Sequence, residues 1–124
     1  MSILLDSHFV LAILEPKLLV GEEWTSETIS VSIASLWEIA IKARQGKLDL
    51  VVPPVKLEER LSGFGCEVLP ITGSHVTAEV DPWPDTNDPF DRLLLAVCQV
   101  EGLRLVTRDR KLVDHPLAWR PRRA

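Results

Sequence analysis

Four acidic residues occupy positions where carboxylates could act together: Asp6, Glu38, Asp91 and Asp109. Two of them follow short apolar segments, and the other two come near the start of predicted helices. Carboxylates that are brought together repel one another unless a cation neutralises them. Mg²⁺ and Mn²⁺ favour sites made of oxygen ligands, and metals held in this way can activate water to cleave a phosphodiester bond.

The predicted elements bring these acids to one edge of a sheet. Apolar and β-branched segments predict strands over residues 2–5, 29–33, 67–70 and 103–107, with a short final strand over 117–119. Helical patterns alternate with them over residues 8–14, 35–45, 55–62, 72–80 and 88–100. This alternation predicts an α/β sandwich with a mainly parallel sheet. Such sheets bind ligands at the carboxyl ends of their strands, where all four acids are expected.

The most informative stretch is the start of the helix that follows residue 88. Asp88 is a good N-cap, Pro89 suits the first helical position, and Asp91 stands three residues after the cap. The next residues are almost all apolar through Val100, and Gly102 then breaks the chain. We therefore expect a mostly buried helix that holds Asp91 at the edge of the core, near the positive end of the helix dipole.

Each acid also has a purely structural explanation. Ser35 and Glu38 fit an S-x-x-E capping box, and Glu38 can pair with Lys42 one helical turn later. The other three fit an N-cap, a helix start and a turn, in the order Asp6, Asp91 and Asp109. From the residues alone, a metal site and four separate structural roles both remain open.

Charge is unevenly distributed along the chain. The net charge is −4, but residues 1–90 carry 6 basic and 14 acidic side chains, whereas residues 91–124 carry 8 basic and 4 acidic ones. The overall charge speaks against a strongly basic nucleic-acid binder, although the basic end could contact a polyanion or an acidic partner. We expect one domain over residues 1–124, with residues 119–124 as a flexible basic tail.

The remaining residues give weaker signals. Cys66 and Cys98 have no metal-ligand spacing and are expected to be reduced thiols in a cytoplasmic protein. The first residues lack the basic start of a signal peptide, and no apolar run is long enough to span a bilayer, so no membrane segment is expected. No histidine has a nucleophile partner at a recognisable spacing, and Trp37, inside an apolar helix, is expected in the core.

Four segments in order over nearly the whole chain resemble one family. They are LLDSH (residues 4–8), VSIASLWEIAIK (31–42), DPFDRLLLA (88–96) and LVTRD (105–109). Together they resemble the PIN-domain ribonucleases, specifically the VapC-type toxins. The resemblance implies a three-layer α/β/α fold around a central parallel sheet. It also implies an endoribonuclease that depends on Mg²⁺ or Mn²⁺, forms a homodimer and is neutralised by a cognate antitoxin.

The resemblance also implies roles for individual positions. Metal binding falls on four acids: Asp6, Glu38, Asp91 and the more variable Asp109. Ser7 and Thr107 match small hydroxyl residues beside the metal, and Asp88 matches an additional acid of the D-P-F-D-R subgroup. The sequence departs from the family at Ser7, where Thr is common, and over residues 17–28, which are short for the second helix usual there.

The leading interpretation is a metal-dependent endoribonuclease that acts as the toxin of a toxin–antitoxin pair. Arg92 and Arg108 are its candidates for contacts with RNA phosphates. The alternative is a catalytically silent PIN-like domain that binds a partner or RNA, and the complete acid set argues against it. A phosphatase or phospho-acceptor domain would also place an acid after the first strand, but His8 stands where the second acid of a D-x-D motif would be.

Overall fold

The chain alternates strands and helices, as its sequence predicts. A computed structural model describes residues 2–14 and 23–121. Its strands are β1 (Ser2–Leu5), β2 (Thr28–Ser32), β3 (Glu67–Leu69) and β4 (Arg104–Val106). Its α-helices are α1 (Ser7–Leu14), α2 (Ile33–Arg44), α3 (Leu57–Gly63), α4 (Gly73–Thr77) and α5 (Pro89–Glu101). Two 3₁₀ turns, η2 (Glu23–Ser26) and η3 (Pro54–Lys56), precede β2 and α3.

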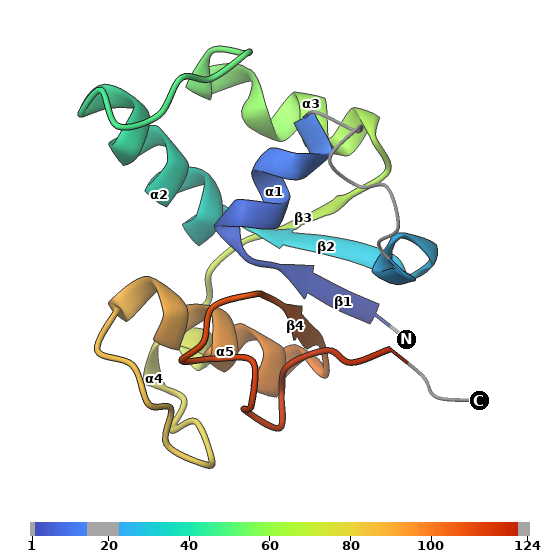
Figure 1. Cartoon of the computed structure of the whole chain (residues 1–124), viewed down its shortest axis with the longest axis vertical. Helices are drawn as coiled ribbons and strands as arrows, with labels where there is room; N and C mark the ends of the chain where they lie inside the picture. Colours follow the sequence, from blue (N-terminus) through green and yellow to red (C-terminus); the bar gives the residue numbers. More distant parts are fainter. Residues whose placement is uncertain (1, 15–22, 122–124) are drawn as a thin grey trace.

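The described strands form one parallel sheet in the order β3-β2-β1-β4. The sheet separates α1, α2 and α3 on one face from α4 and α5 on the other (Figure 1). The predicted three-layer α/β/α fold with a parallel sheet is therefore confirmed. Because the strands are parallel, their carboxyl ends meet at one edge, and the helices that follow them start there.

The core lies on both faces of the central strand β1. Ile3 and Leu5 pack in the cluster formed with α1, α2 and α3, whereas Leu4 packs in the cluster formed with α5. All three side chains are fully buried. This alternation is the two-residue period of a strand that is covered on both faces. The strand is consequently fixed in register, and so is Asp6 directly after it.

Helix α5 starts and ends where its sequence predicts. Asp88 is the N-cap and accepts a hydrogen bond from the Phe90 N–H at 2.9 Å, and Pro89 is the first helical residue. Gly102 follows the helix in the left-handed conformation, with φ of 72°. The helix runs along the sheet beside β4 and turns its buried residues toward Leu4 and Leu105.

Three sequence predictions of local structure differ from the fold. Helix α2 begins at Ile33 rather than Ser35, because Ser32 takes an extended conformation and caps the helix by accepting the Ala34 N–H. The predicted strand over 117–119 is reduced to one bridge between Leu105 and Ala118. Helix α4 is shorter than the predicted 72–80. The predicted end of the first helix near residue 15, and residues 17–22 of the short segment, lie outside the described residues.

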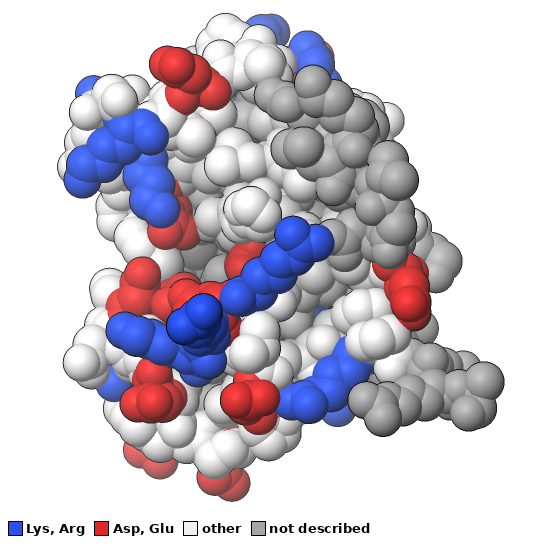
Figure 2. Space-filling view, in the orientation of Figure 1, with Lys and Arg blue, Asp and Glu red and all other residues white. Residues whose placement is uncertain are grey.

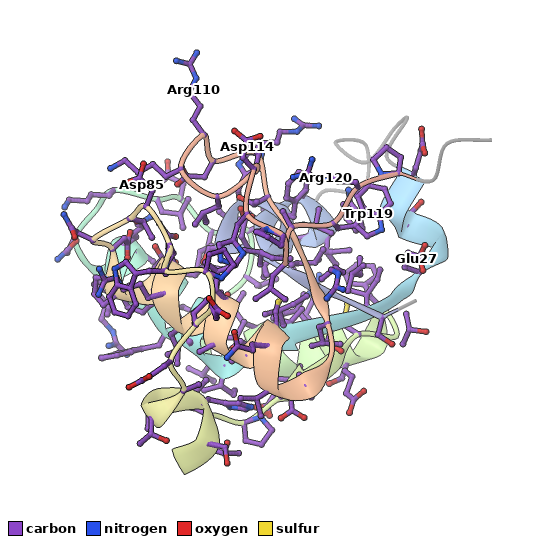
Figure 3. The ribbon with its side chains drawn as sticks, turned by 90° about the horizontal axis from the view of Figure 1, so that it is seen from below. Glu27, Asp85, Arg110, Asp114, Trp119 and Arg120 are labelled. Atoms are coloured by element: carbon purple, nitrogen blue, oxygen red, sulfur yellow. The ribbon has the colours of Figure 1, made fainter. Side chains whose placement is uncertain are left out.

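The C-terminal part returns along β4 before the chain ends. Trp119 is half-buried and donates its backbone N–H to the Leu105 carbonyl. The guanidinium of Arg120 donates to the Val113 carbonyl at 3.0 Å. Arg110, by contrast, points away from the body of the protein (Figure 3). The last three residues of the predicted tail, 122–124, lie outside the described residues.

Candidate metal centre

Asp6 lies directly after β1, at the carboxyl edge of the sheet. Its N–H donates to the Val106 carbonyl at 3.2 Å, and its Oδ1 accepts the Phe9 N–H at 3.1 Å, so it caps α1. Burial raises the pKa of Asp6 above its ordinary value of 3.8, while hydrogen bonds from Thr107 and Phe9 oppose the rise. The predicted N-cap role is thus confirmed. It uses one carboxylate oxygen, and the Thr107 hydroxyl donates a further hydrogen bond to this carboxylate.

Glu38 lies in the second turn of α2 because the helix begins at Ile33. The predicted capping box with Ser35 is therefore wrong. Instead, the Ser7 hydroxyl donates a short hydrogen bond to Glu38 Oε1, and Lys42 Nζ lies 3.2 Å from Oε2. The pairing with Lys42 is confirmed, and the hydroxyl of Ser7 links the start of α1 to α2.

Asp91 lies in the first turn of α5 and is held from the preceding loop. The hydroxyl of buried Thr86 donates to Asp91 Oδ2 at 3.2 Å and accepts the Asp88 N–H at 3.2 Å. The Nε of Arg92 donates to the Thr86 carbonyl at 2.8 Å, which ties the loop to the helix. Thr86 is thus the residue that orients the Asp91 carboxylate.

The pKa of Asp91 depends on the other acids at this edge of the sheet. Burial, followed by the neighbouring Asp88 carboxylate, raises the pKa of Asp91 from 3.8 to about 6. The Thr86 hydrogen bond opposes this rise, and Asp109 and Glu38 contribute to it. Figure 2 shows acidic side chains gathered on this face between α2 and the start of α5, with Lys and Arg side chains on both sides. Glu38, Asp91 and Asp109 therefore share one electrostatic environment.

Asp109 is the most exposed of the four acids. Its Oδ1 accepts the Lys111 N–H at 2.9 Å, and its own N–H donates to the Thr107 hydroxyl at 3.1 Å. The predicted turn role is confirmed by these two bonds. Thr107 contacts both Asp109 and Asp6, so it bridges the ends of β4 and β1.

The donor chemistry of this edge fits a hard divalent cation, but the acids are not drawn tightly together. The oxygens come from carboxylates, and their mutual repulsion at Asp91 is what a bound cation would relieve. Among residues 2–14 and 23–121, no three His, Cys, Asp or Glu side chains are close enough together to hold a metal ion. Metal binding by these residues remains a prediction.

The two arginines predicted to meet RNA are both stacked on aromatic rings. The Arg92 guanidinium carbon lies 4.5 Å from the centroid of the Trp83 ring, and that of Arg108 lies 5.2 Å from the centroid of Phe9. Arg108 is exposed beside α1, and Arg92 is half-buried beside the Thr86 loop. Both lie close to predicted metal ligands, because Phe9 and Thr86 contact Asp6 and Asp91.

Sequence reasoning missed Thr86 and misplaced Trp37. Thr86 precedes the recognisable helix cap by only two residues, and a hydroxyl that close to an N-cap is the signal that could have found it.

Trp37 was expected in the core but is 61% exposed. Its ring lies edge-to-face against that of Phe90, with 5.6 Å between the ring centroids. Its helix buries Leu36 and Ile39, and Trp37 faces away from them. Cys66 and Cys98 are buried free thiols, as predicted.

Comparison with known proteins identifies the family to which this fold and its acidic edge belong. Residues 3–116 match the PIN domain family, and the chain belongs to that family. It is 31% identical to ribonuclease VapC22 of Mycobacterium tuberculosis over 90 residues, which cover 73% of this chain and 69% of that protein. The predicted resemblance to VapC-type PIN-domain proteins is confirmed.

A solved structure extends the similarity over the whole fold. A toxin–antitoxin complex from Klebsiella pneumoniae contains a chain that matches with a TM-score of 0.65 and 13% identity, over 98% of this chain and 99% of that one. At this identity the match supports the fold.

Within the described residues, none of the helices combines the length and the hydrophobicity needed to cross a bilayer.

Proposed function

We propose that the chain is a metal-dependent endoribonuclease and the toxin of a toxin–antitoxin pair. The observation that carries the proposal is the gathering of acids at the carboxyl edge of a PIN-family fold, where burial, and then Asp88, Asp109 and Glu38, raise the pKa of Asp91 to about 6. A half-buried carboxylate near other acids is costly to ionise without a cation. The similarity to ribonuclease VapC22 supports RNA as the substrate.

Asp6, Glu38, Asp91 and Asp109 are the residues that would hold Mg²⁺ or Mn²⁺. The cation would supply a water molecule of lowered pKa and would neutralise the charge that develops on the phosphate. Around it, hydroxyl groups orient the acids: Ser7 for Glu38, Thr107 for Asp6 and Thr86 for Asp91. Arg92 and Arg108 lie beside these acids and supply positive charge for RNA phosphates.

RNA cleavage tests the proposal directly. We expect the purified protein to cut cellular RNA with Mg²⁺ or Mn²⁺ and to lose this activity in EDTA. Asp6→Asn and Asp91→Asn should each lower the rate at least 100-fold, because each removes a charge on which metal binding depends. Asp49→Asn is the matched control, since Asp49 is an exposed aspartate in the loop after α2. Cleavage that survives both site substitutions would refute the assignment.

One observation favours the silent-domain alternative. Glu38 is engaged by Ser7 and Lys42, and no three described acids are within metal-binding reach of one another. Titration calorimetry with Mn²⁺ separates the two functions. Binding that disappears in Asp91→Asn supports the nuclease, whereas no heat of binding in the unsubstituted protein supports the silent domain.

The partners of the proposed toxin follow from the family resemblance. We propose a cognate antitoxin protein and a homodimer. Co-expression with a cognate antitoxin should yield a complex that elutes as one species and does not cleave RNA. Light scattering should give the mass of two chains for the toxin alone. A monomer that no antitoxin inhibits would contradict both statements.

A further inference from the structure

A polar pocket lies beside the candidate metal centre, on the loop that leads into α5. Its volume is about 240 Å³, and its lining includes Trp83, Asp85, Thr86, Asn87, Arg92 and Lys111. This volume is below the roughly 300–1,000 Å³ of pockets for drug-sized ligands, so the pocket suits a smaller group, such as a single nucleobase. None of the four predicted metal ligands is needed to form it.

Trp83 supplies an aromatic surface in this pocket. Its side chain is 67% exposed, although Arg92 is stacked over the ring at 4.5 Å. The guanidinium contacts the ring by a cation–π interaction, and the exposed remainder of the side chain is accessible to a ligand. An exposed tryptophan held in this way is a suitable platform for an unstacked nucleobase.

The other lining groups match the polar parts of a nucleotide. Lys111 and Arg92 place two positive charges at the pocket, against the single negative charge of Asp85. Asn87 and Asp85 offer an amide and a carboxylate that can bond to the edge of a base. Both charged and aromatic contacts are therefore present in one small pocket.

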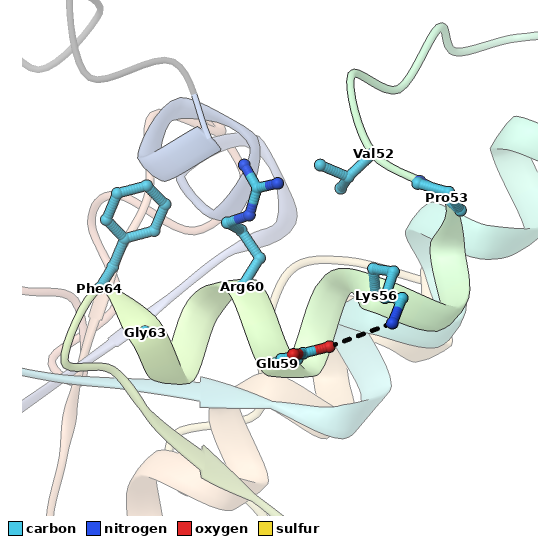
Figure 4. A pocket seen from close by; sticks show the side chains of 7 residues that line it. All are labelled: Val52, Pro53, Lys56, Glu59, Arg60, Gly63 and Phe64. Atoms are coloured by element: carbon cyan, nitrogen blue, oxygen red, sulfur yellow. Dashed lines mark hydrogen bonds and ion pairs between the residues drawn. The ribbon is translucent and has the colours of Figure 1, made fainter.

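A hydrogen bond from one lining residue connects the pocket to Asp91. Thr86 lines the pocket and donates its hydroxyl to Asp91 Oδ2. A nucleotide bound there would lie next to the phosphate that the acids are proposed to act on. The larger hollow of about 590 Å³ along α3 has no such connection. It is lined by residues of η3 and α3, by Val52 and Pro53 before them and by Phe64 after them (Figure 4).

We propose that the Trp83 pocket binds one nucleotide of single-stranded RNA, with its base stacked on Trp83 and an adjacent phosphate paired with Lys111. The inference rests on the proposed nuclease function and assigns one nucleotide of its substrate to a position beside Asp91. In a duplex the base faces are occupied by stacking, and Trp83 would have no partner.

Binding of short RNA tests the inference. All proteins carry Asp6→Asn, so that RNA remains uncut in Mg²⁺, and a labelled single strand of ten nucleotides is titrated by fluorescence anisotropy. Trp83→Ala should weaken binding roughly tenfold, and Trp83→Phe should restore most of it. Lys111→Ala should lower the dependence of log K on log[salt] by about 0.7, the value for one phosphate of a single strand.

Two controls make the result specific. Phe64→Ala removes an aromatic side chain that is 48% exposed on the α3 side, and it should leave binding unchanged. A duplex of the same sequence should bind equally to the protein with and without Trp83. Because Trp83 is largely exposed, its replacement should leave the melting temperature unchanged as well.

The outcomes separate this inference from the proposed function. Equal single-strand affinity with and without Trp83, in a protein that cleaves RNA, would overturn the pocket and leave the nuclease intact. If the protein with an intact Trp83 pocket neither cleaved nor bound RNA, both the inference and the proposed function would be overturned. A Trp83→Ala protein that changes its oligomeric mass by light scattering, but not its RNA affinity, would assign the surface to a second copy of the chain and overturn the inference.

Discussion

Replacing Asp91 by Asn should stabilise the metal-free protein at neutral and higher pH. The pKa of Asp91 is raised from 3.8 to about 6, first by burial and then by Asp88. An acid whose pKa is higher in the folded chain than in the unfolded chain destabilises the fold when it is ionised. The Asn side chain has the same shape and no charge, and its Oδ1 can still accept the hydrogen bond from Thr86.

The size of the effect follows from the pKa. A difference of about 2 between the folded and the unfolded chain corresponds to about 3 kcal/mol for a fully shielded group. Asp91 is only half-buried, so solvent screening lowers the expected gain in the free energy of unfolding to roughly 1 kcal/mol. For a chain of this length, that gain raises the melting temperature by roughly 4 °C.

The gain should depend on pH in a defined direction. It is complete above pH 6, shrinks as the pH falls from about 6 to about 4, and disappears below the pKa of the unfolded aspartate. Urea unfolding in EDTA at pH 8 and pH 4 measures it, with Asp49→Asn as the control that should show no change. If Asp91→Asn were no more stable than the unsubstituted protein at pH 8, or if the difference were the same at both pH values, the electrostatic argument would be refuted.

Two further substitutions test the surroundings of the acids and of α5. Ser7→Ala should weaken Mn²⁺ binding roughly tenfold by calorimetry, because Glu38 loses the hydroxyl that orients it, and Ser7→Thr should retain the affinity; equal affinity for the Ala variant would contradict this. Gly102→Ala should lower the free energy of unfolding, measured in urea, by roughly 1 kcal/mol, because residue 102 has φ of 72°. Gly63→Ala is the control: residue 63 is helical and an added Cβ would meet open space, so this change should not be destabilising.

The parts of the fold that the sequence predicted well are set by local chemistry. Helix α5 begins at Asp88 and Pro89 and is followed by Gly102, because a cap, a proline and a left-handed glycine each act within one turn. The parallel sheet followed from the alternation of apolar strands and helices, and the two faces of β1 bear it out. These features needed no knowledge of distant contacts.

The errors come from choices that distant contacts decide. Ser32 and Ser35 are both suitable N-caps, and the pairing of β2 with β3, which extends to Ser32, selects the first. Ser35 is then drawn into the first turn, where its buried Oγ has no hydrogen-bond partner among the described residues. Trp37 was misplaced for a simpler reason, since counting apolar neighbours ignored the helical period that turns it away from Leu36 and Ile39.

The groups around the acids help to distinguish a structural role from a functional one. Pairing with Lys or Arg would cancel the charge of an acid. Here Asp6, Glu38 and Asp91 each accept a hydrogen bond from a hydroxyl, which fixes a carboxylate in place without neutralising it. Lys42 on Glu38 is the exception, and it is half-exposed at the end of a flexible side chain, so a divalent cation can displace it. Carboxylates oriented by hydroxyls at the carboxyl edge of a parallel sheet support the proposed metal site. Spacing alone could not predict this arrangement, because the hydroxyls of Ser7, Thr86 and Thr107 come from three separate segments.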